Sequence, residues 1–269
     1  MLGLFAGTGR LPHLLAQRLA ATGRPFAVVH LEGHRPEGLG DVPHVAFRVE
    51  RLSRLFDRLG ELGVREACFA GAAQRPELAL TAINVASAPL VARVGAALSK
   101  GDDGLLRVAV ALLEERGIAV VGAHVIAPDL LPPAGVLTGR VGRGLRSDAA
   151  RAESVLDALA PVDVGQGCVV SRGRVLAIEA LPGTDWMLGS LAADRRGPPG
   201  GLLMKAPKAG QDRRVDLPAI GPSTVAACRR ADLAAIVIEA GGVMVLDRDE
   251  TVAAARDAGL TLWVRRRGG

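Results

Sequence analysis

Residues 2–21, LGLFAGTGRLPHLLAQRLAA, pass from an apolar run through a glycine turn into an amphipathic segment. The apolar run, Leu2–Ala6, predicts a buried strand. The turn Gly7-Thr8-Gly9 follows, and apolar residues at helical spacing then predict a helix over Leu11–Ala21. A strand that passes through a glycine turn into a helix is typical of a parallel α/β sheet.

The same alternation continues through the first half of the chain. Apolar runs predict strands over Phe26–Leu31, Glu66–Ala70 and Ala119–Gly122. Periodic segments between them predict helices over Arg51–Leu62, Val85–Leu98 and Leu105–Arg116. Strands that alternate with helices indicate βαβ units. We therefore predict a Rossmann-like, parallel-sheet domain over residues 1–131.

The second half has a different pattern. Pro128–Asp148 is rich in Pro, Gly and Arg and predicts a linker or loop, followed by a helix over Ala149–Ala160. The runs Cys168–Ser171 and Val175–Ala180 flank a glycine turn and predict a hairpin. Further short elements are expected over Leu202–Lys205, Thr224–Ala231, Ala235–Glu239, Val243–Leu246 and Thr251–Ala258. The predicted fold class is thus α/β, with a mixed α/β domain over residues 132–269 and a ligand cleft between the two domains.

Composition excludes some classes of protein. The 269 residues carry a net charge of +5, which suits a protein that meets phosphates or membranes but also suits an arginine-rich composition without that role. Aromatic residues make up 3% and tyrosine is absent, so base stacking and a nucleic-acid partner are not expected. The three cysteines are far apart and predict a reducing compartment. Without a signal-peptide pattern, we expect a cytoplasmic protein.

The glycine turn at residues 7–9 admits two interpretations. Backbone N–H groups at the start of a helix favour an anion, so the turn predicts contact with a phosphate or sugar. A tight turn without a ligand is the alternative. The pattern departs from the dinucleotide-binding fingerprint because Pro12 stands where a third glycine would be, although Glu32 ends the second strand at a suitable spacing.

Two acidic clusters also have competing interpretations. The segment Lys100-Gly101-Asp102-Asp103 precedes a predicted helix, where an aspartate would cap the helix or the group would meet phosphate and metal. In the segment Glu179-Ala-Leu-Pro-Gly183-Thr184-Asp185, a strand ends in a carboxylate and a glycine turn presents a hydroxyl and a second carboxylate. An ordinary loop turn is the alternative for this second segment.

The densest polar region is Lys205–Pro218, where cations and carboxylates alternate between prolines. Phosphoryl chemistry uses this mixture, because cations offset phosphate charge and carboxylates hold Mg²⁺ or activate water. A solvated charge run is the alternative here, and is the interpretation that we give to Arg265-Arg266-Arg267. The histidines lack the spacing of zinc ligands, so no zinc site is expected.

These segments together resemble the UDP-2,3-diacylglucosamine pyrophosphatases of lipid A biosynthesis, of the Mg-dependent type found in alphaproteobacteria and other Gram-negative bacteria. The matching pieces, in chain order, include Ala6–Pro12, Phe69–Gly71, Lys100–Asp103, Gly122–His124, Asp163–Gly167, Glu179–Asp185, Leu203–Lys208, Gln211–Pro218 and Ile220-Gly221. Leu181 departs from the family pattern, where an acidic residue is expected.

The resemblance implies a reaction and a set of site residues. Water would attack the β-phosphorus of UDP-2,3-diacylglucosamine, giving UMP and 2,3-diacylglucosamine 1-phosphate (lipid X), with Mg²⁺ as cofactor. Asp216 matches the family's essential aspartate and is the candidate metal ligand or water activator, with Glu179 as a second metal ligand. Asp185 and Lys205 are further catalytic candidates. The candidate substrate-binding residues are Gly7, Thr8, Gly9, Leu11, Pro12, Lys100, Asp102, Asp103, Gln166, Thr184, Lys208, Gln211, Asp212 and Arg214.

A lipid substrate also implies peripheral contact with the inner-membrane surface, while a homodimer is left open. Two functions of other classes remain at this point. A nicotinamide-dependent oxidoreductase would use Gly7, Gly9 and Glu32 but would leave the cluster Lys205–Pro218 without a task. A non-catalytic lipid- or nucleotide-binding protein would show binding without Mg²⁺-dependent turnover.

Overall fold

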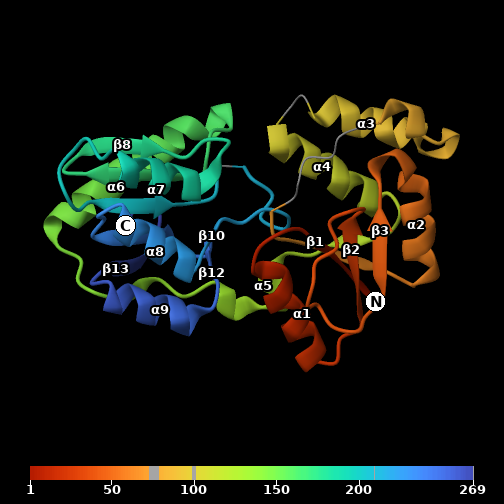
Figure 1. The fold of residues 1–269 in the computed structure, drawn as a ribbon, viewed down its shortest axis with the longest axis horizontal. Coiled ribbons are helices and arrows are strands. Elements are labelled where there is room, and N and C mark those ends of the chain that lie inside the picture. Colours follow the sequence, from red (N-terminus) through yellow and green to blue (C-terminus); the bar gives the residue numbers. More distant parts are fainter. Residues whose placement is uncertain (73–78, 99–100, 209, 269) are drawn as a thin grey trace. The chain divides into compact units, whose positions relative to one another are not determined.

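A computed structural model describes the chain except residues 73–78, 99–100, 209 and 269 (Figure 1). The chain divides into two compact units. Unit 1 comprises Met1–Pro128 and the short segment Asp212–Asp216. Unit 2 comprises Asp129–Gln211 and Leu217–Gly269. The polar region predicted over Lys205–Pro218 is therefore shared between the units, since its central part belongs to unit 1.

Unit 1 contains a five-stranded sheet in the order β3-β2-β1-β4-β5, and every pair in it is parallel. Its strands are β1 (Leu2–Ala6), β2 (Phe26–Leu31), β3 (His44–Phe47), β4 (Glu66–Ala70) and β5 (Ala119–Val120). The strand order reverses direction between β1 and β4, and ligands of open α/β sheets bind outside the carboxyl ends of strands at such a point. The predicted Rossmann-like sheet is confirmed.

The helices of unit 1 are α1 (Leu11–Ala21), α2 (Leu52–Glu61), α3 (Ala88–Leu98), α4 (Gly101–Glu114) and α5 (Ala123–Ile126). Short 3₁₀ turns precede α2 at Val49–Arg51 and α3 at Val85–Ser87. The prediction that Gly101–Asp103 form a turn before the fourth helix is wrong. The helix α4 already begins at Gly101, so Asp102 and Asp103 lie in its first turn. The side chains of those two aspartates, and the whole of Lys100, lie outside the described residues.

Unit 2 contains a mixed six-stranded sheet in the order β6-β13-β11-β9-β7-β8. Its strands are β6 (Gly135–Thr138), β7 (Gly167–Ser171), β8 (Arg174–Ile178), β9 (Leu202–Lys205), β11 (Ala235–Glu239) and β13 (Thr261–Arg265). Strands β9, β11 and β13 are parallel, whereas β6 and the hairpin β7–β8 run antiparallel to their neighbours. A separate parallel pair joins β10 (Ala219–Ile220) to β12 (Met244–Val245). The predicted hairpin and mixed α/β class are confirmed.

The helices of unit 2 are α6 (Arg143–Leu159), α7 (Gly183–Ala193), α8 (Pro222–Arg230) and α9 (Arg248–Asp257). Two of them correct the expectations from sequence. The predicted linker Pro128–Asp148 contains β6, which pairs with β13, and the start of α6. The predicted turn Gly183-Thr184-Asp185 is the first turn of α7, which is anchored by the buried residues Met187, Leu188 and Leu191. In the described part of the chain, no helix is long and apolar enough to cross a bilayer.

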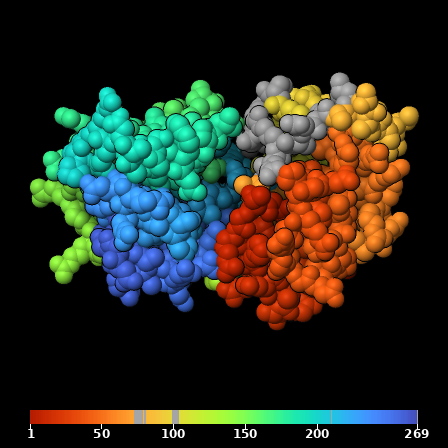
Figure 2. Space-filling view, viewed as in Figure 1, coloured from red at the N-terminus to blue at the C-terminus, as the bar shows by residue number. Residues whose placement is uncertain are grey.

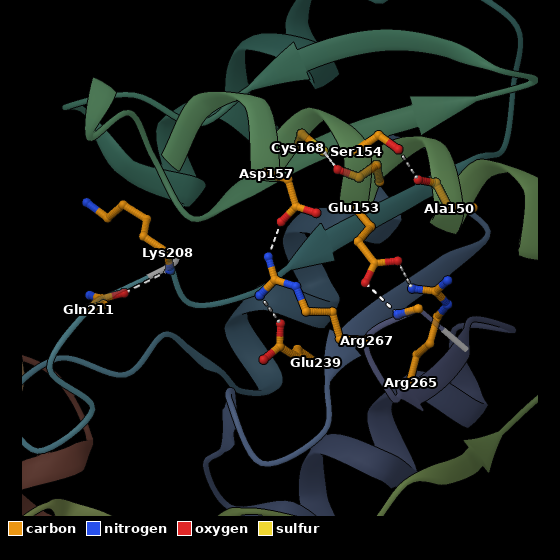
Figure 3. A network of polar contacts seen from close by, with 12 residues as sticks. Ala150, Glu153, Ser154, Asp157, Cys168, Lys208, Gln211, Glu239, Arg265 and Arg267 are labelled. Carbon is orange, nitrogen blue, oxygen red and sulfur yellow. Dashed lines mark hydrogen bonds and ion pairs between the residues drawn. The ribbon is translucent and has the colours of Figure 1, made fainter. Parts of the chain in front are cut away.

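The C-terminal arginine run is a further correction. Arg265 ends β13 with only 5% of its side chain exposed and donates to Glu153 of α6 at 2.6 Å. Arg267 contacts Asp157 and, at 3.2 Å, Glu239 (Figure 3). The solvated-run interpretation fails for Arg265 because β13 pairs with β11 inside the sheet, which brings this side chain against Glu153 of α6. Arg266 and Arg267 are both exposed, as predicted, although Arg267 also forms ion pairs.

Candidate functional site

Unit 1 has a pocket of about 350 Å³ at the carboxyl ends of its central strands. The rings of Phe5, Phe47 and Phe69 form an aromatic wall, and the centroids of Phe5 and Phe69 are 4.9 Å apart. Asp216 also lines the pocket, although it is distant in sequence from the strands. The ends of β1, β2 and β4 and the loops after them supply other lining residues, among them Thr8, His30 of β2 and His34. The pocket thus combines apolar walls with a carboxylate at the place where α/β sheets bind ligands.

The predicted glycine turn forms part of this pocket, but most of its backbone donors are used inside the fold. The N–H of Gly7 donates to the carbonyl of Ala70 at 2.8 Å, and the N–H of Thr8 donates to that of Ala72 at 3.0 Å. A Cβ on Gly7 would collide with the Ala72 carbonyl, so the close approach of the two loops requires glycine. A phosphate contact therefore depends on Gly9 and the start of α1. The predicted contacts Leu11 and Pro12 are buried in that first turn.

Asp216 is carried by a turn that an ion-pair network holds in place. The N–H of Arg214 donates to the carboxylate of Asp212 at 3.0 Å, and the N–H of Val215 donates to the backbone carbonyl of Asp212 at 3.1 Å. The guanidinium of Arg214 contacts Asp212 at 2.7 Å and Glu114 of α4 at 2.7 Å. Hydrogen bonds from this guanidinium hold the pKa of Asp212 below its usual range. Arg214 therefore already shares its charge with two carboxylates.

Unit 2 brings a second set of predicted residues together around Lys205, at the carboxyl end of β9. The Lys205 side chain is buried, and its Nζ donates to Thr184 Oγ1 of α7 at 2.6 Å. Glu179 Oε2 lies 3.7 Å from the same Nζ and accepts no hydrogen bond from the described residues. The packing is tight, because a Cβ on Gly167 would come within 2.6 Å of Glu179 Oε2. The sequence-predicted residues Lys205, Thr184 and Glu179 thus form one cluster.

Three more predicted residues lie in unit 2 and contact one another. Gln166 Nε2 donates to Gln211 Oε1 at 3.0 Å. The backbone N–H of Lys208 donates to the same oxygen at 3.0 Å (Figure 3). The ammonium of Lys208 forms an ion pair with Asp163. From the sequence, Asp163 is placed in the motif Asp163–Gly167 but is not predicted as a site residue. Its position two residues before Gly165 is the feature of the sequence that could have indicated a role in the site. Asp185 is exposed in the first turn of α7.

The two candidate metal ligands do not share a unit, since Asp216 belongs to unit 1 and Glu179 to unit 2. Among the described residues, no group of three or more His, Cys, Asp or Glu side chains is arranged to hold a metal ion. Mg²⁺ often binds through one or two carboxylates, with water and substrate phosphates as its other ligands. Asp216, at a pocket, fits that requirement. Glu179 faces an ammonium in the place that a cation would take.

Comparison with known proteins identifies the family. A model described as the LpxI N-terminal domain matches residues 1–130, and a model described as the LpxI C-terminal domain matches residues 133–263. The chain belongs to the LpxI family. It is 38% identical over 270 residues to UDP-2,3-diacylglucosamine pyrophosphatase LpxI of Caulobacter vibrioides, an alignment that covers 96% of this chain and 95% of that protein. The family inferred from the sequence motifs is confirmed.

Proposed function

We propose that this LpxI-family chain hydrolyses UDP-2,3-diacylglucosamine to UMP and 2,3-diacylglucosamine 1-phosphate, a step of lipid A synthesis. One observation carries the proposal: a relative named for this pyrophosphatase activity aligns with nearly the full length of the chain at 38% identity. The proposal includes the Mg²⁺ requirement and attack of water on the β-phosphorus.

The unit 1 pocket supports the proposal through the character of its walls. Aromatic and aliphatic side chains suit the apolar parts of a lipid nucleotide, and Asp216 adds a carboxylate to them. We assign to Asp216 the task of holding Mg²⁺ or of accepting a proton from the attacking water. When bound, Mg²⁺ would offset negative charge on the pyrophosphate.

The unit 2 cluster supports the proposal through its cations. A pyrophosphate concentrates negative charge, and Lys205 and Lys208 are ammonium groups that can donate to its oxygens. Thr184 holds the Lys205 ammonium in one position, so we assign it a positioning role. We propose that contact with the inner-membrane surface supplies the substrate.

The position of Glu32 argues against the alternative function of a nicotinamide-dependent oxidoreductase. Glu32, which would bind a ribose, forms an ion pair with Arg48 at 3.7 Å and lines a different groove from the pocket beside Gly7. Nothing in the described residues favours that alternative over hydrolysis. A binding protein without turnover is separated from an enzyme by the experiment below.

Hydrolysis in ¹⁸O-labelled water tests both whether the reaction occurs and which phosphorus atom the water attacks. Attack on the β-phosphorus breaks the bond between that phosphorus and the bridging oxygen. The labelled oxygen then enters diacylglucosamine 1-phosphate, and UMP leaves with the bridging oxygen. Mass spectrometry should find the label in the lipid product only, and only when Mg²⁺ is present. Label in UMP would move the attack to the α-phosphorus, and absence of both products would contradict the proposed function.

A further inference from the structure

Unit 1 has a second concave surface, which we call the arginine groove. It encloses about 340 Å³ between β3 and α2 and is lined by four arginines, Arg48, Arg51, Arg54 and Arg58. All four are exposed. They belong to the part of unit 1 that is coloured orange in Figure 2. The charged and titratable lining is completed by Glu32 and His44.

Helical spacing explains why Arg54 and Arg58 point the same way, and Arg51 stands at the N-cap of the same helix. Leu52, Leu55 and Leu59 are buried and fix one face of α2 against the sheet. Arg54 and Arg58 each stand one residue before a leucine of that set, so their side chains form a stripe along one side of the helix, and Arg51, just before Leu52, lines the same groove. The stripe and the neighbouring strand β3 then form the two walls of the groove.

The positive charge of the groove is only partly neutralised. Arg48 lies 3.4 Å from Glu50 and 3.7 Å from Glu32, and Arg58 contacts Glu61 at 2.7 Å. Glu50 is also committed elsewhere, because its buried carboxylate accepts the N–H of Ala79 at 2.8 Å. Within the described ranges, neither Arg51 nor Arg54 forms an ion pair with a carboxylate. Two guanidinium groups therefore remain available to an anion from outside.

The edge of the sheet adds backbone donors to this wall. β3 is an edge strand of the sheet. The N–H of Val28 donates to the carbonyl of Pro43, and the N–H of Glu32 donates to the carbonyl of Phe47. Bonding alternates along a parallel strand, so the N–H groups of His44 and Ala46 point away from β2. Both residues line the groove, and neither N–H donates to a described residue. Guanidinium and peptide N–H donors are the groups that bind phosphate oxygens in proteins.

We propose that the arginine groove binds a phosphate-bearing anion, through Arg51 and Arg54 with support from Arg48 and the edge of β3. A multiply charged phosphate fits better than a single carboxylate, because several guanidinium forks converge on one small volume. The groove lies outside the residues assigned to the reaction, so the site goes beyond the proposed function. Its phosphate comes from a soluble phosphate compound or from the head group of an anionic phospholipid.

Binding measurements on a double variant test the proposal. The proteins compared are wild type, the variant Arg51→Gln/Arg54→Gln and the matched control Arg229→Gln/Arg230→Gln. Each double variant lacks two exposed positive charges that wild type has. Titration calorimetry with inorganic pyrophosphate, without Mg²⁺, reports binding of a soluble phosphate compound. Co-sedimentation with vesicles of phosphatidylglycerol and phosphatidylcholine, at the same ionic strength, reports binding of a lipid head group. Circular dichroism confirms that each variant is folded.

We expect saturable binding that weakens at least tenfold in the Arg51→Gln/Arg54→Gln variant and less than twofold in the control. Loss confined to pyrophosphate identifies a soluble ligand, and loss confined to vesicles identifies a lipid head group. Equal losses in both variants, or no saturable binding by wild type in either assay, would overturn the proposal. UMP release from detergent-solubilised substrate should be unchanged in both variants, so failure of the groove and failure of the proposed function are distinguishable.

Discussion

Replacing Arg265 with methionine tests the account of the C-terminal strand. The guanidinium of Arg265 is buried and donates to Glu153 at 2.6 Å, and the carboxylate of Glu153 also accepts the N–H of Gly268 at 2.8 Å (Figure 3). Burial alone would raise the pKa of Glu153, but hydrogen bonds from Arg265 and Gly268, with the charges of Arg265 and Arg267, hold it below the usual range. Methionine keeps the apolar stem of the side chain and removes the charge.

The expected loss follows from the burial of both partners, whose side chains are 5% and 14% exposed. Removing one member of a buried pair costs about 3–5 kcal/mol, because the other charge is left uncompensated. Glu153 keeps one backbone donor and a more distant arginine, which places the cost at the lower end, about 3 kcal/mol. For a chain of this size that free energy corresponds to a fall in Tm of roughly 6–12 °C.

Urea unfolding, followed by tryptophan fluorescence and circular dichroism, measures this loss. The matched control is Arg266→Met, which removes an exposed charge one residue away and should change the free energy of unfolding by less than about 0.5 kcal/mol. The double variant Arg265→Met/Glu153→Gln should recover part of the loss, because no charge is then left unpaired. Equal stability of the Arg265→Met and Arg266→Met variants would refute the buried ion pair.

Three further predictions concern other parts of the molecule. Thr184→Val should lower kcat/KM for UMP release about tenfold through loss of the acceptor for Lys205, and Thr184→Ser should restore it; equal activity of both variants would exclude a positioning role. The folded pKa of Asp212 is lowered by Arg214, so its contribution to stability is present above the unfolded aspartate pKa of about 4 and is lost as pH falls through the folded pKa. Asp212→Asn should therefore lose less stability than wild type in urea titrations between pH 6 and pH 3, and identical slopes would contradict this. Burial raises the pKa of each cysteine thiol to about 12, so a thiol reagent at pH 8 should label none in the native protein and all three after unfolding, whereas rapid native labelling would contradict their burial.

Local sequence patterns predict the elements whose stability comes from their own apolar residues. The strands Leu2–Ala6 and Phe26–Leu31 and the helix Leu11–Ala21 have the bounds expected from sequence. β13 was missed although its residues are apolar, because its place in the sheet depends on pairing with β11 and β6. The start of α6 was missed because Gly and Arg residues resemble a loop until their contacts in the fold are known.

The candidate site shows the same limit. The motifs single out Lys205, Thr184 and Glu179, and the structure places Thr184 and Glu179 each within 4 Å of the Lys205 ammonium. Spacing alone gives no indication that Lys208 pairs with Asp163, because a carboxylate 45 residues away must be placed by the fold. The aromatic wall beside Asp216 was equally hidden, since its rings come from separate strands.

The proposed function gives Asp216 a direct part in Mg²⁺-dependent cleavage of UDP-2,3-diacylglucosamine. The most direct test measures UMP release by wild type, Asp216→Asn and the exposed control Asp57→Asn, with and without Mg²⁺. We predict UMP from wild type and the control only when Mg²⁺ is present, and a rate at least 100-fold lower for Asp216→Asn, in line with loss of a catalytic proton acceptor. Undiminished UMP release by folded Asp216→Asn protein would contradict the claim.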